Sequence, residues 1–316
     1  MNSKSKAPEA AGAQERTSTA SSGHIQVMAR GMSLADAFSI LAAPMVAQVA
    51  RQVCECRLSA DPESLHKLRV ALRRLRSLWW AYEKHLNVPQ ARLQRREFKS
   101  LADAAGQTRD WDILKHLLTA DKAMKRSFKT LIERVDVQRS DALLCSRRTI
   151  EGADVGQMLE QRVADALRQL NADSVHESLE LFASERVASA EKALKKRVNR
   201  VVTHLDPEYA ELHEVRIAGK KLRYLLEFFS PLIDSRQEMG VDDLAQLQDE
   251  LGKLNDIVSS DALLREHAEQ LGEHAAVENA ISYLTVQKEH HMQRAYEMLR
   301  AVGAMRAEKR PDAYTG

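Results

Sequence analysis

The chain of 316 residues is 44% hydrophobic, which suffices for one large helical domain or two small ones. Its 47 Lys and Arg balance 45 Asp and Glu to a net charge of +2, so the total charge says nothing about an anionic partner, and only the distribution of charge does. No run of 18 apolar residues occurs, and no membrane span is expected. The three cysteines, Cys54, Cys56 and Cys145, give no disulfide framework and fit a reducing compartment.

Long helices are predicted for the whole region between two tails. Residues 1–29 are rich in Ser, Ala and Thr and are expected to be disordered, and residues 306–316 are expected to fray. With 12 Gly and 7 Pro in the chain, turns are few, and no segment alternates as a strand does. Helical periodicity predicts helices over 33–58, 62–86, 90–105, 109–121, 123–149, 157–170, 174–204, 207–230, 237–253, 256–270 and 272–303. The stretch 151–156 is the expected hinge in this all-α chain.

An internal repeat organises the sequence. The segment His-Lys-Leu-Arg-Val-Ala-Leu-Arg-Arg-Leu-Arg at 66–76 aligns without a gap with His-Glu-Val-Arg-Ile-Ala-Gly-Lys-Lys-Leu-Arg at 213–223. Asp-Pro-Glu precedes each copy, at 61–63 and 206–208, and is predicted to start each helix. A weaker match follows, between the segments Ala-Gly-Gln-Thr-Arg-Asp that begins at Ala105 and Leu-Gly-Lys-Leu-Asn-Asp that begins at Leu251. The repeat predicts two related helical halves, about 32–150 and 174–303.

Basic residues gather on one face of each repeated helix. At about 100° per residue most of them form a stripe roughly 80° wide that lies away from the leucines, and Arg74 and Lys221 lie to the side of it. The candidate anion-binding residues are His66, Arg69, Arg73, Arg74 and Arg76 in the first copy and His213, Arg216, Lys220, Lys221 and Arg223 in the second. Like charges four residues apart cost a helix about 0.2–0.5 kcal/mol per pair, and a solvated face usually mixes signs instead. Repetition of this cost in both halves points to an external anion, with a solvated or ion-paired face as the alternative.

Other positions extend the candidate surface or the core. Possible secondary anion contacts are Arg95, Arg96 and Lys99, which share one helix face with Arg92, and Lys196 and Arg200, which precede the second motif. The aromatic residues after the motifs are expected to anchor the core rather than to stack on bases; they are Trp79, Trp80, Phe228 and Phe229.

The two motifs resemble the signature helices of the CHAD family, the conserved histidine α-helical domain. The stretch Gly-Gln-Thr-Arg-Asp-Trp-Asp at 106–112 and Ser-Leu-Ala-Asp-Ala-Phe at 33–38 are also similar to that family, so that the resemblance covers about 30–305. It implies two four-helix bundles with pseudo-two-fold symmetry around a basic central cavity. It further implies binding of inorganic polyphosphate by the residues named above, and a cytoplasmic location at polyphosphate granules. Lys220 and Lys221 stand where the first copy has arginine, which keeps the charge and loses bidentate geometry.

Three other functions stay open at this stage. A helical nucleic-acid-binding protein also needs basic faces, although no zinc finger, basic zipper or aromatic strand motif occurs. A phosphohydrolase would need a metal or a nucleophile, and only Asp110, Asp112 and Asp256 offer themselves as ligands. These aspartates are simpler to explain as helix-terminal acids or as partners of the arginines. A scaffolding role through acidic helices is the third. We expect a binding protein with no metal, no cofactor and no catalytic residues.

Overall fold

The computed structural model describes residues 28–58, 62–172, 177–204, 207–233, 241–272 and 274–308. No strand occurs in these ranges, so the prediction of an all-α protein is confirmed. The helices are α1 (Leu34–Leu58), α2 (Pro62–Ala81), the 3₁₀ turn η1 (Glu83–His85), α3 (Val88–Ala104), α4 (Gln107–Thr119), α5 (Lys122–Ser127), α6 (Lys129–Gly152), α7 (Val155–Ala172), α8 (Leu179–Thr203), α9 (Tyr209–Phe229), α10 (Val241–Glu266), α11 (Ala268–Leu271) and α12 (His274–Glu308).

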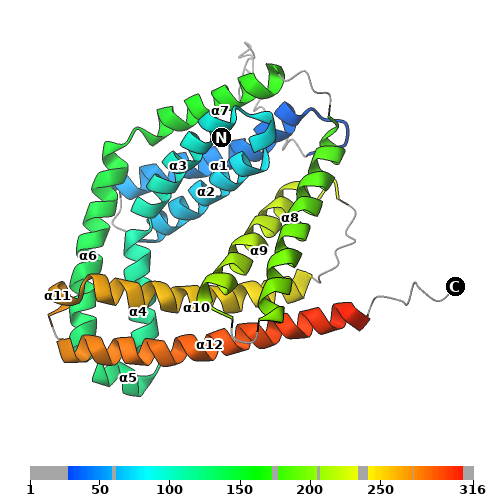
Figure 1. Cartoon of the computed structure of the whole chain (residues 1–316). Helices are drawn as coiled ribbons and strands as arrows, with labels where there is room; N and C mark the ends of the chain where they lie inside the picture. Colours follow the sequence, from blue (N-terminus) through cyan, green and yellow to red (C-terminus); the bar gives the residue numbers. More distant parts are fainter. Residues whose placement is uncertain are drawn as a thin grey trace, which may run out of the picture.

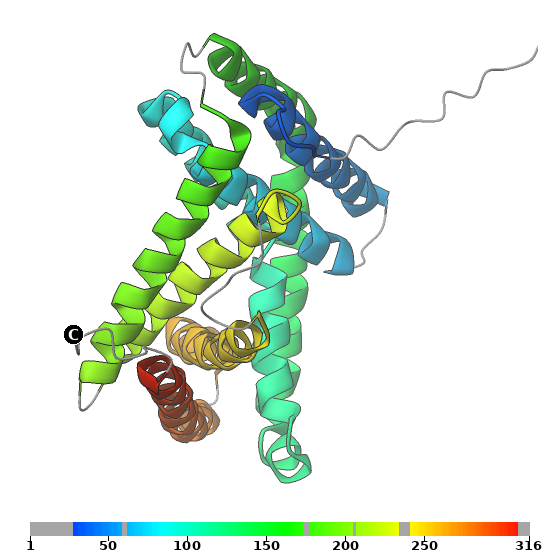
Figure 2. The same cartoon turned by 90° about the vertical axis from the view of Figure 1, so that its right-hand side faces the viewer.

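Long helices that are near one another in the sequence pack as antiparallel pairs (Figure 1). α1 lies on α2, α8 lies on α9, α4 lies on α6, and α10 lies on α12. α3 covers another side of α2, and α7 returns along α1. Figure 2 shows α10 and α12 nearly end-on, with α8 and α9 on one side and α4 and α6 on the other. The motif helices α2 and α9 are therefore each backed by their own neighbours and also contact each other.

The apolar core joins the two predicted halves of the chain. Phe38, Trp79 and Tyr82 from the first half and Phe182 and Phe229 from the second are all fully buried. Their rings contact edge-on or tilted, with centroids 4.8 Å apart for Tyr82 and Phe182 and 5.6 Å apart for Phe182 and Phe229. Such aromatic pairs add about 0.5–1.5 kcal/mol beyond the burial of their area. This shared core fixes α2 relative to α9, whereas the pseudo-two-fold symmetry of two bundles remains a prediction.

A second apolar cluster lies away from the first. It joins α4 and α6 to α10 and α12 through buried side chains that include Trp111, Leu118, Leu131, Leu264 and Leu284. Helices of the two halves thus meet in both clusters.

Several predicted helix boundaries are wrong. α10 runs unbroken through 254–255, where a break was expected, because Leu251, Leu254 and Ile257 continue its buried face. α2 ends at Ala81 instead of 86, and the helix predicted at 123–149 is divided at Phe128. α9 begins at Tyr209, after an extended Glu208, rather than at the Asp-Pro-Glu. The expected hinge coincides with the turn between α6 and α7. The tail predicted for 1–29 falls mostly outside the described residues, as does most of the tail predicted for 306–316.

One described helix, α1, is long and apolar enough by length and composition to cross a membrane. Its apolar side is nevertheless used inside the protein: Phe38, Ala42 and Val49 are fully buried, and the helix packs against α2 and α7. A core helix of this length passes the same test as a membrane span, and burial favours the core role.

Candidate functional site

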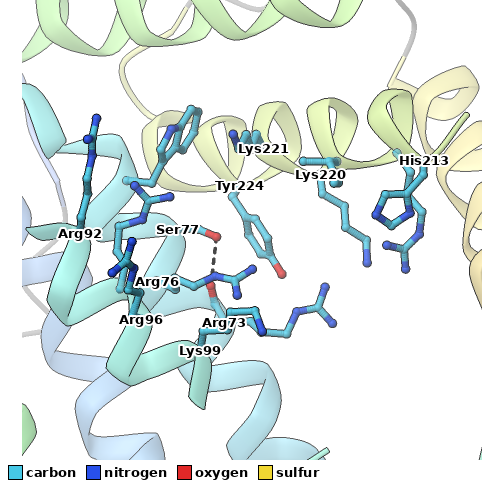
Figure 3. Close-up of a pocket in the computed structure, with 14 residues that line it drawn as sticks. Arg73, Arg76, Ser77, Arg92, Arg96, Lys99, His213, Lys220, Lys221 and Tyr224 are labelled. Atoms are coloured by element: carbon cyan, nitrogen blue, oxygen red, sulfur yellow. Dashed lines mark hydrogen bonds between the residues drawn. The ribbon is translucent and has the colours of Figure 1, made fainter. Parts of the chain in front are cut away.

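A cavity of about 570 Å³ opens between α2, α3 and α9. Figure 3 shows the side chains of the three helices converging on it. Ten of the fourteen side chains that line this basic cavity are basic, and none is acidic. The basic ones are Arg73, Arg76, Arg92, Arg95, Arg96, Lys99, His213, Arg216, Lys220 and Lys221; the others are Ser77, Trp80, Ile217 and Tyr224.

The two-sided character of the motif helices produces this concentration of charge. Leu68, Leu72 and Leu75 on α2 are fully buried in the core. On α9, Val215 and Leu222 are buried in the same way. With the leucine faces turned inward, the basic stripes of both helices face the space between them. The core packing therefore turns part of each stripe toward one cavity, and α3 supplies a third basic wall.

Some of the candidate anion-binding residues are neutralised by acids and do not line the basic cavity. Arg69 lies 3.1 Å from Asp110 and donates to the carbonyl of Gly106 at 3.3 Å. Glu227 lies 3.6 Å from both Arg74 and Arg223 and so bridges α2 and α9. These three arginines are ion-paired, as the alternative interpretation expected. We infer that they stabilise the packing of the helices.

The cations at the centre of the basic cavity lack such partners. Among the described residues, no carboxylate lies within ion-pair distance of Arg73, Arg76, Arg216 or Lys220. Asp256 on α10 supplies an opposing charge, which raises the pKa of Lys220 while the arginines lower it. An incompletely compensated, partly buried cluster of like charge is unstable by itself and favours an anion that neutralises it.

The pKa of Lys220 reflects this excess of positive charge. Burial, together with Arg73, Arg216 and Arg223, lowers the pKa of Lys220 from 10.5 to about 7. Burial and neighbouring cations also lower the pKa of Arg216. Lys220 is thus only partly charged near neutral pH in the free protein, and an anion in the basic cavity would favour its ammonium form.

Replacement of Lys220 by an apolar residue is expected to stabilise the unliganded protein. Lys220→Met removes a buried charge among arginines, and we expect the free energy of unfolding to rise by about 1 kcal/mol or more near neutral pH. The unfolded chain holds the lysine proton up to about 10.5, whereas the folded chain releases it from about 7. The destabilisation by Lys220 is therefore complete below pH 7 and disappears as pH rises toward 10.5.

Thermal unfolding of Lys220→Met and of the unchanged protein, at pH 6.5 and at pH 10, measures this difference. Lys125→Met on the exposed α5 is the matched control and should show no gain at either pH. A Lys220→Met protein that melts at or below the unchanged protein at pH 6.5 would contradict the proposed repulsion.

The two motif histidines occupy different positions. His213 lines the basic cavity and pairs with the Tyr209 hydroxyl at 3.2 Å. His66 is not among the lining residues, and its buried Nδ1 has no hydrogen-bond partner among the described residues. Burial lowers the pKa of His66, as does Arg109, and burial and Arg216 lower that of His213. In the free protein both imidazoles therefore gain a proton only at a pH below the ordinary histidine pKa of 6.5.

The secondary residues divide by helix. Arg95, Arg96 and Lys99 line the basic cavity, although Arg95 also contacts Glu83 at 3.0 Å and Lys99 contacts Asp103 at 2.5 Å. Lys196 and Arg200 lie on α8 and line none of the described pockets. Arg200 instead pairs with Glu214 at 3.3 Å, so its proposed ligand role and that of Lys196 are not supported by the geometry.

Sequence reasoning missed two aromatic residues of the basic cavity. Trp79, Phe228 and Phe229 are buried core anchors as expected, but Trp80 packs on the core and also lines the cavity, as does Tyr224. The helical wheel contains the signal: Trp80 falls about 40° from His66, and Tyr224 about 20° from His213, on the basic stripes.

The aspartates considered as metal ligands do not gather. Asp110 pairs with Arg69, and Asp112 pairs with Arg139 on α6. Within the described ranges no three His, Cys, Asp or Glu side chains are placed to hold a metal ion together. Asp256 faces the arginines of α9, and burial raises its pKa while Arg216 lowers it. Asp110 is thus an arginine partner, as the simpler interpretation expected.

Taken with its fold, this site defines a helical module built around a basic cavity. The model of the CHAD domain matches residues 41–265, most of the chain, and the protein belongs to the CHAD family. CHAD domains are generally binding domains rather than catalytic ones.

Two solved structures share the fold. The crystal structure of the CHAD domain from the plant Ricinus communis superposes with a TM-score of 0.76 at 27% identity, over 88% of this chain and 94% of that one. PptA from Streptomyces chartreusis superposes with a TM-score of 0.64 at 16% identity, over 86% of this chain and 100% of that one, which shows the fold alone. A search among curated proteins found no match.

Proposed function

We propose that this protein binds inorganic polyphosphate in the basic cavity. The observation that carries the proposal is the convergence of ten basic side chains, and no acidic one, on a single hollow of about 570 Å³. Arginines bind phosphate oxygens bidentately, and lysine and histidine add single charge-assisted hydrogen bonds. A flexible chain of phosphates supplies one negative charge after another along α2, α3 and α9, which matches cations distributed over three walls.

The cavity geometry favours polyphosphate over duplex nucleic acid. The unpaired cations, Arg73, Arg76, Arg216 and Lys220, line a hollow instead of forming an outer ridge. A duplex, whose major groove alone is about 12 Å wide, does not enter a space of that size. Reading of bases would also need exposed aromatic platforms, and Trp80 already lies against the cations Arg186 and Lys221.

The role we propose is binding and localisation, in the cytoplasm at polyphosphate granules, without chemistry on the ligand. Incubation of the protein with long polyphosphate and Mg²⁺, with release of orthophosphate as the readout, tests this directly. Release above that of a boiled sample would favour the phosphohydrolase alternative.

Binding is expected to be strongly salt-dependent. Each cation that neutralises a phosphate releases a counterion, and for single strands the log–log slope is roughly −0.7 per contact. With five or more contacts in the basic cavity, the affinity for long polyphosphate should fall with a slope of about −3 or steeper. Titrations at several salt concentrations measure the slope, and a nearly flat dependence would contradict the model.

Affinity should also rise with chain length and discriminate against DNA. A long chain engages the walls of α2, α3 and α9 together, so each further contact gains from effective concentration. Competition with tripolyphosphate, ATP and duplex DNA against labelled long polyphosphate tests this at physiological salt. Equal competition by tripolyphosphate would favour a small phosphate-ester site, and equal competition by DNA the nucleic-acid alternative.

A further inference from the structure

A second, smaller pocket adjoins the basic cavity. Trp80, Ile217 and Lys221 line both, so they form the wall between them. This side pocket has a volume of about 100 Å³ and lies between α8 and α9. Its lining comprises Trp80, Arg186, Ser189, Ala190, Ala193, Arg197, Ile217, Ala218 and Lys221.

Two of its cations are held at the Trp80 indole. The guanidinium carbon of Arg186 lies 4.6 Å from the ring centroid and the ammonium of Lys221 lies 4.9 Å from it. An Nη of Arg186 donates to the carbonyl of Trp80 at 3.0 Å, which fixes the guanidinium against α2. The Nε of Arg186 is buried and has no hydrogen-bond partner among the described residues. Arg186 therefore retains an unused donor at a fixed position beside the side pocket.

The carboxylates near this group are already engaged. Glu83, the acid that acts on both Arg186 and Lys221, pairs with Arg92 at 3.1 Å and Arg95 at 3.0 Å. Glu214, 3.6 Å from Arg197, is shared with Arg200. No described carboxylate lies within ion-pair distance of Arg186 or Lys221.

The size of the side pocket limits what it can hold. Its volume of about 100 Å³ is small beside the roughly 570 Å³ of the basic cavity, so the side pocket suits one small anionic group better than a chain. The planar fork of arginine and the point charge of lysine favour an anion with several oxygens.

We propose that the side pocket binds a single phosphate group, held by Arg186, Arg197 and Lys221. The group is either the terminal phosphate of a chain whose remainder lies in the basic cavity or a free orthophosphate. The first source rests on the proposed function, and the second does not. In the first case the wall residue Lys221 contacts both the chain and its end, and the protein distinguishes linear polyphosphate from cyclic forms, which have no terminal group.

Isothermal titration of the full chain with three probes tests this proposal: linear tripolyphosphate, cyclic trimetaphosphate and orthophosphate. The variant is Arg186→Gln, and the matched control is Arg76→Gln, which removes a cation that lines only the basic cavity. A hydrogen bond to a charged group contributes about 1.5–3 kcal/mol, which corresponds to roughly tenfold or more in affinity. We expect Arg186→Gln to weaken linear tripolyphosphate by that factor and leave cyclic trimetaphosphate unchanged, whereas Arg76→Gln weakens both.

Orthophosphate separates the two sources. If Arg186→Gln weakens orthophosphate binding tenfold or more and Arg76→Gln does not, the side pocket is supported as a site for free phosphate. Because this arm uses no chain, it gives the same answer whether or not long polyphosphate binds the basic cavity. Equal affinities of Arg186→Gln and the unchanged protein for linear tripolyphosphate and orthophosphate would overturn the proposal. So would equal weakening of linear and cyclic ligands, because Arg186 would then act only through the placement of Trp80.

A second variant covers the case in which Arg186→Gln does not fold. Ala193→Leu fills the side pocket without removing a charge, from a half-buried position on α8. It should give the same pattern, with linear tripolyphosphate or orthophosphate weakened and cyclic trimetaphosphate retained. Unchanged binding of all three ligands by Ala193→Leu would exclude occupation of the side pocket.

Discussion

Charge reversal at Arg73 and Lys220 together is expected to abolish binding of long polyphosphate. Both side chains line the basic cavity, from α2 and α9 respectively, and neither is paired with a described carboxylate. Each reversal removes a charge-assisted contact of about 1.5–3 kcal/mol and places a carboxylate where phosphate would lie, so the double variant should lose at least about a hundredfold in affinity. Either single reversal should weaken binding less. Titration with labelled polyphosphate at physiological salt measures the loss.

The fold should survive these changes. A glutamate at either position gains the remaining arginines of the basic cavity as ion-pair partners, so Arg73→Glu with Lys220→Glu should stay helical by circular dichroism and unfold cooperatively. Lys125→Glu with Lys129→Glu makes the same change in charge at exposed positions on α5 and α6, and should leave binding intact. If the double reversal folds and binds like the unchanged protein, the basic cavity is not the site.

The second large effect concerns pH. Because the pKa of Lys220 is about 7 in the free protein, and a bound polyanion favours the ammonium form, binding above pH 7 takes up a proton. Affinity should be highest below pH 7 and fall as pH rises, by up to about tenfold per pH unit until the pKa of the bound state is reached. Internal phosphates of a long chain are already ionised in this range, so the change belongs to the protein.

Lys220→Arg isolates the responsible group. Arginine stays protonated throughout this range. The variant also makes the second motif match the first, which has an arginine, Arg73, at this position. We expect a flatter profile between pH 7 and 9 and an affinity at pH 9 at least about tenfold above that of the unchanged protein. Lys253→Arg, an exposed lysine on α10 outside the basic cavity, is the control and should keep the full pH dependence. If the pH profile of Lys220→Arg is unchanged, the group that titrates is not Lys220 but another, such as Lys221.

Much of this protein could be predicted from local features of its sequence. Helix formation depends on intrinsic propensity and on apolar spacing, both of which are properties of a short segment. The same spacing determines the angular position of a side chain around its own helix, so the division between Leu72 in the core and Arg73 in the basic cavity follows from the sequence. The helical wheel also places Trp80 and Tyr224 on the basic stripes. Trp80 was missed because it was taken for a core residue, and Tyr224 was not considered.

Only the tertiary structure decided which cations remain available to a ligand. Arg69 is neutralised by Asp110 and Arg74 by Glu227, and these acids come from distant parts of the chain. Local spacing also failed at helix ends: Gly106 caps α4, whereas its counterpart Gly252 lies inside the unbroken α10.

The physical reason is that periodicity gives an angle about one helix axis and contains no information about the distance to another helix. That distance depends on the shared core around Phe182 and Phe229, which places α9 against α2. The low pKa of Lys220 arises from the same packing, since it needs burial and the approach of Arg73 from α2. The sequence of each helix therefore determines which basic side chains lie on one face of it. The excess of positive charge in the basic cavity depends on how the helices pack together.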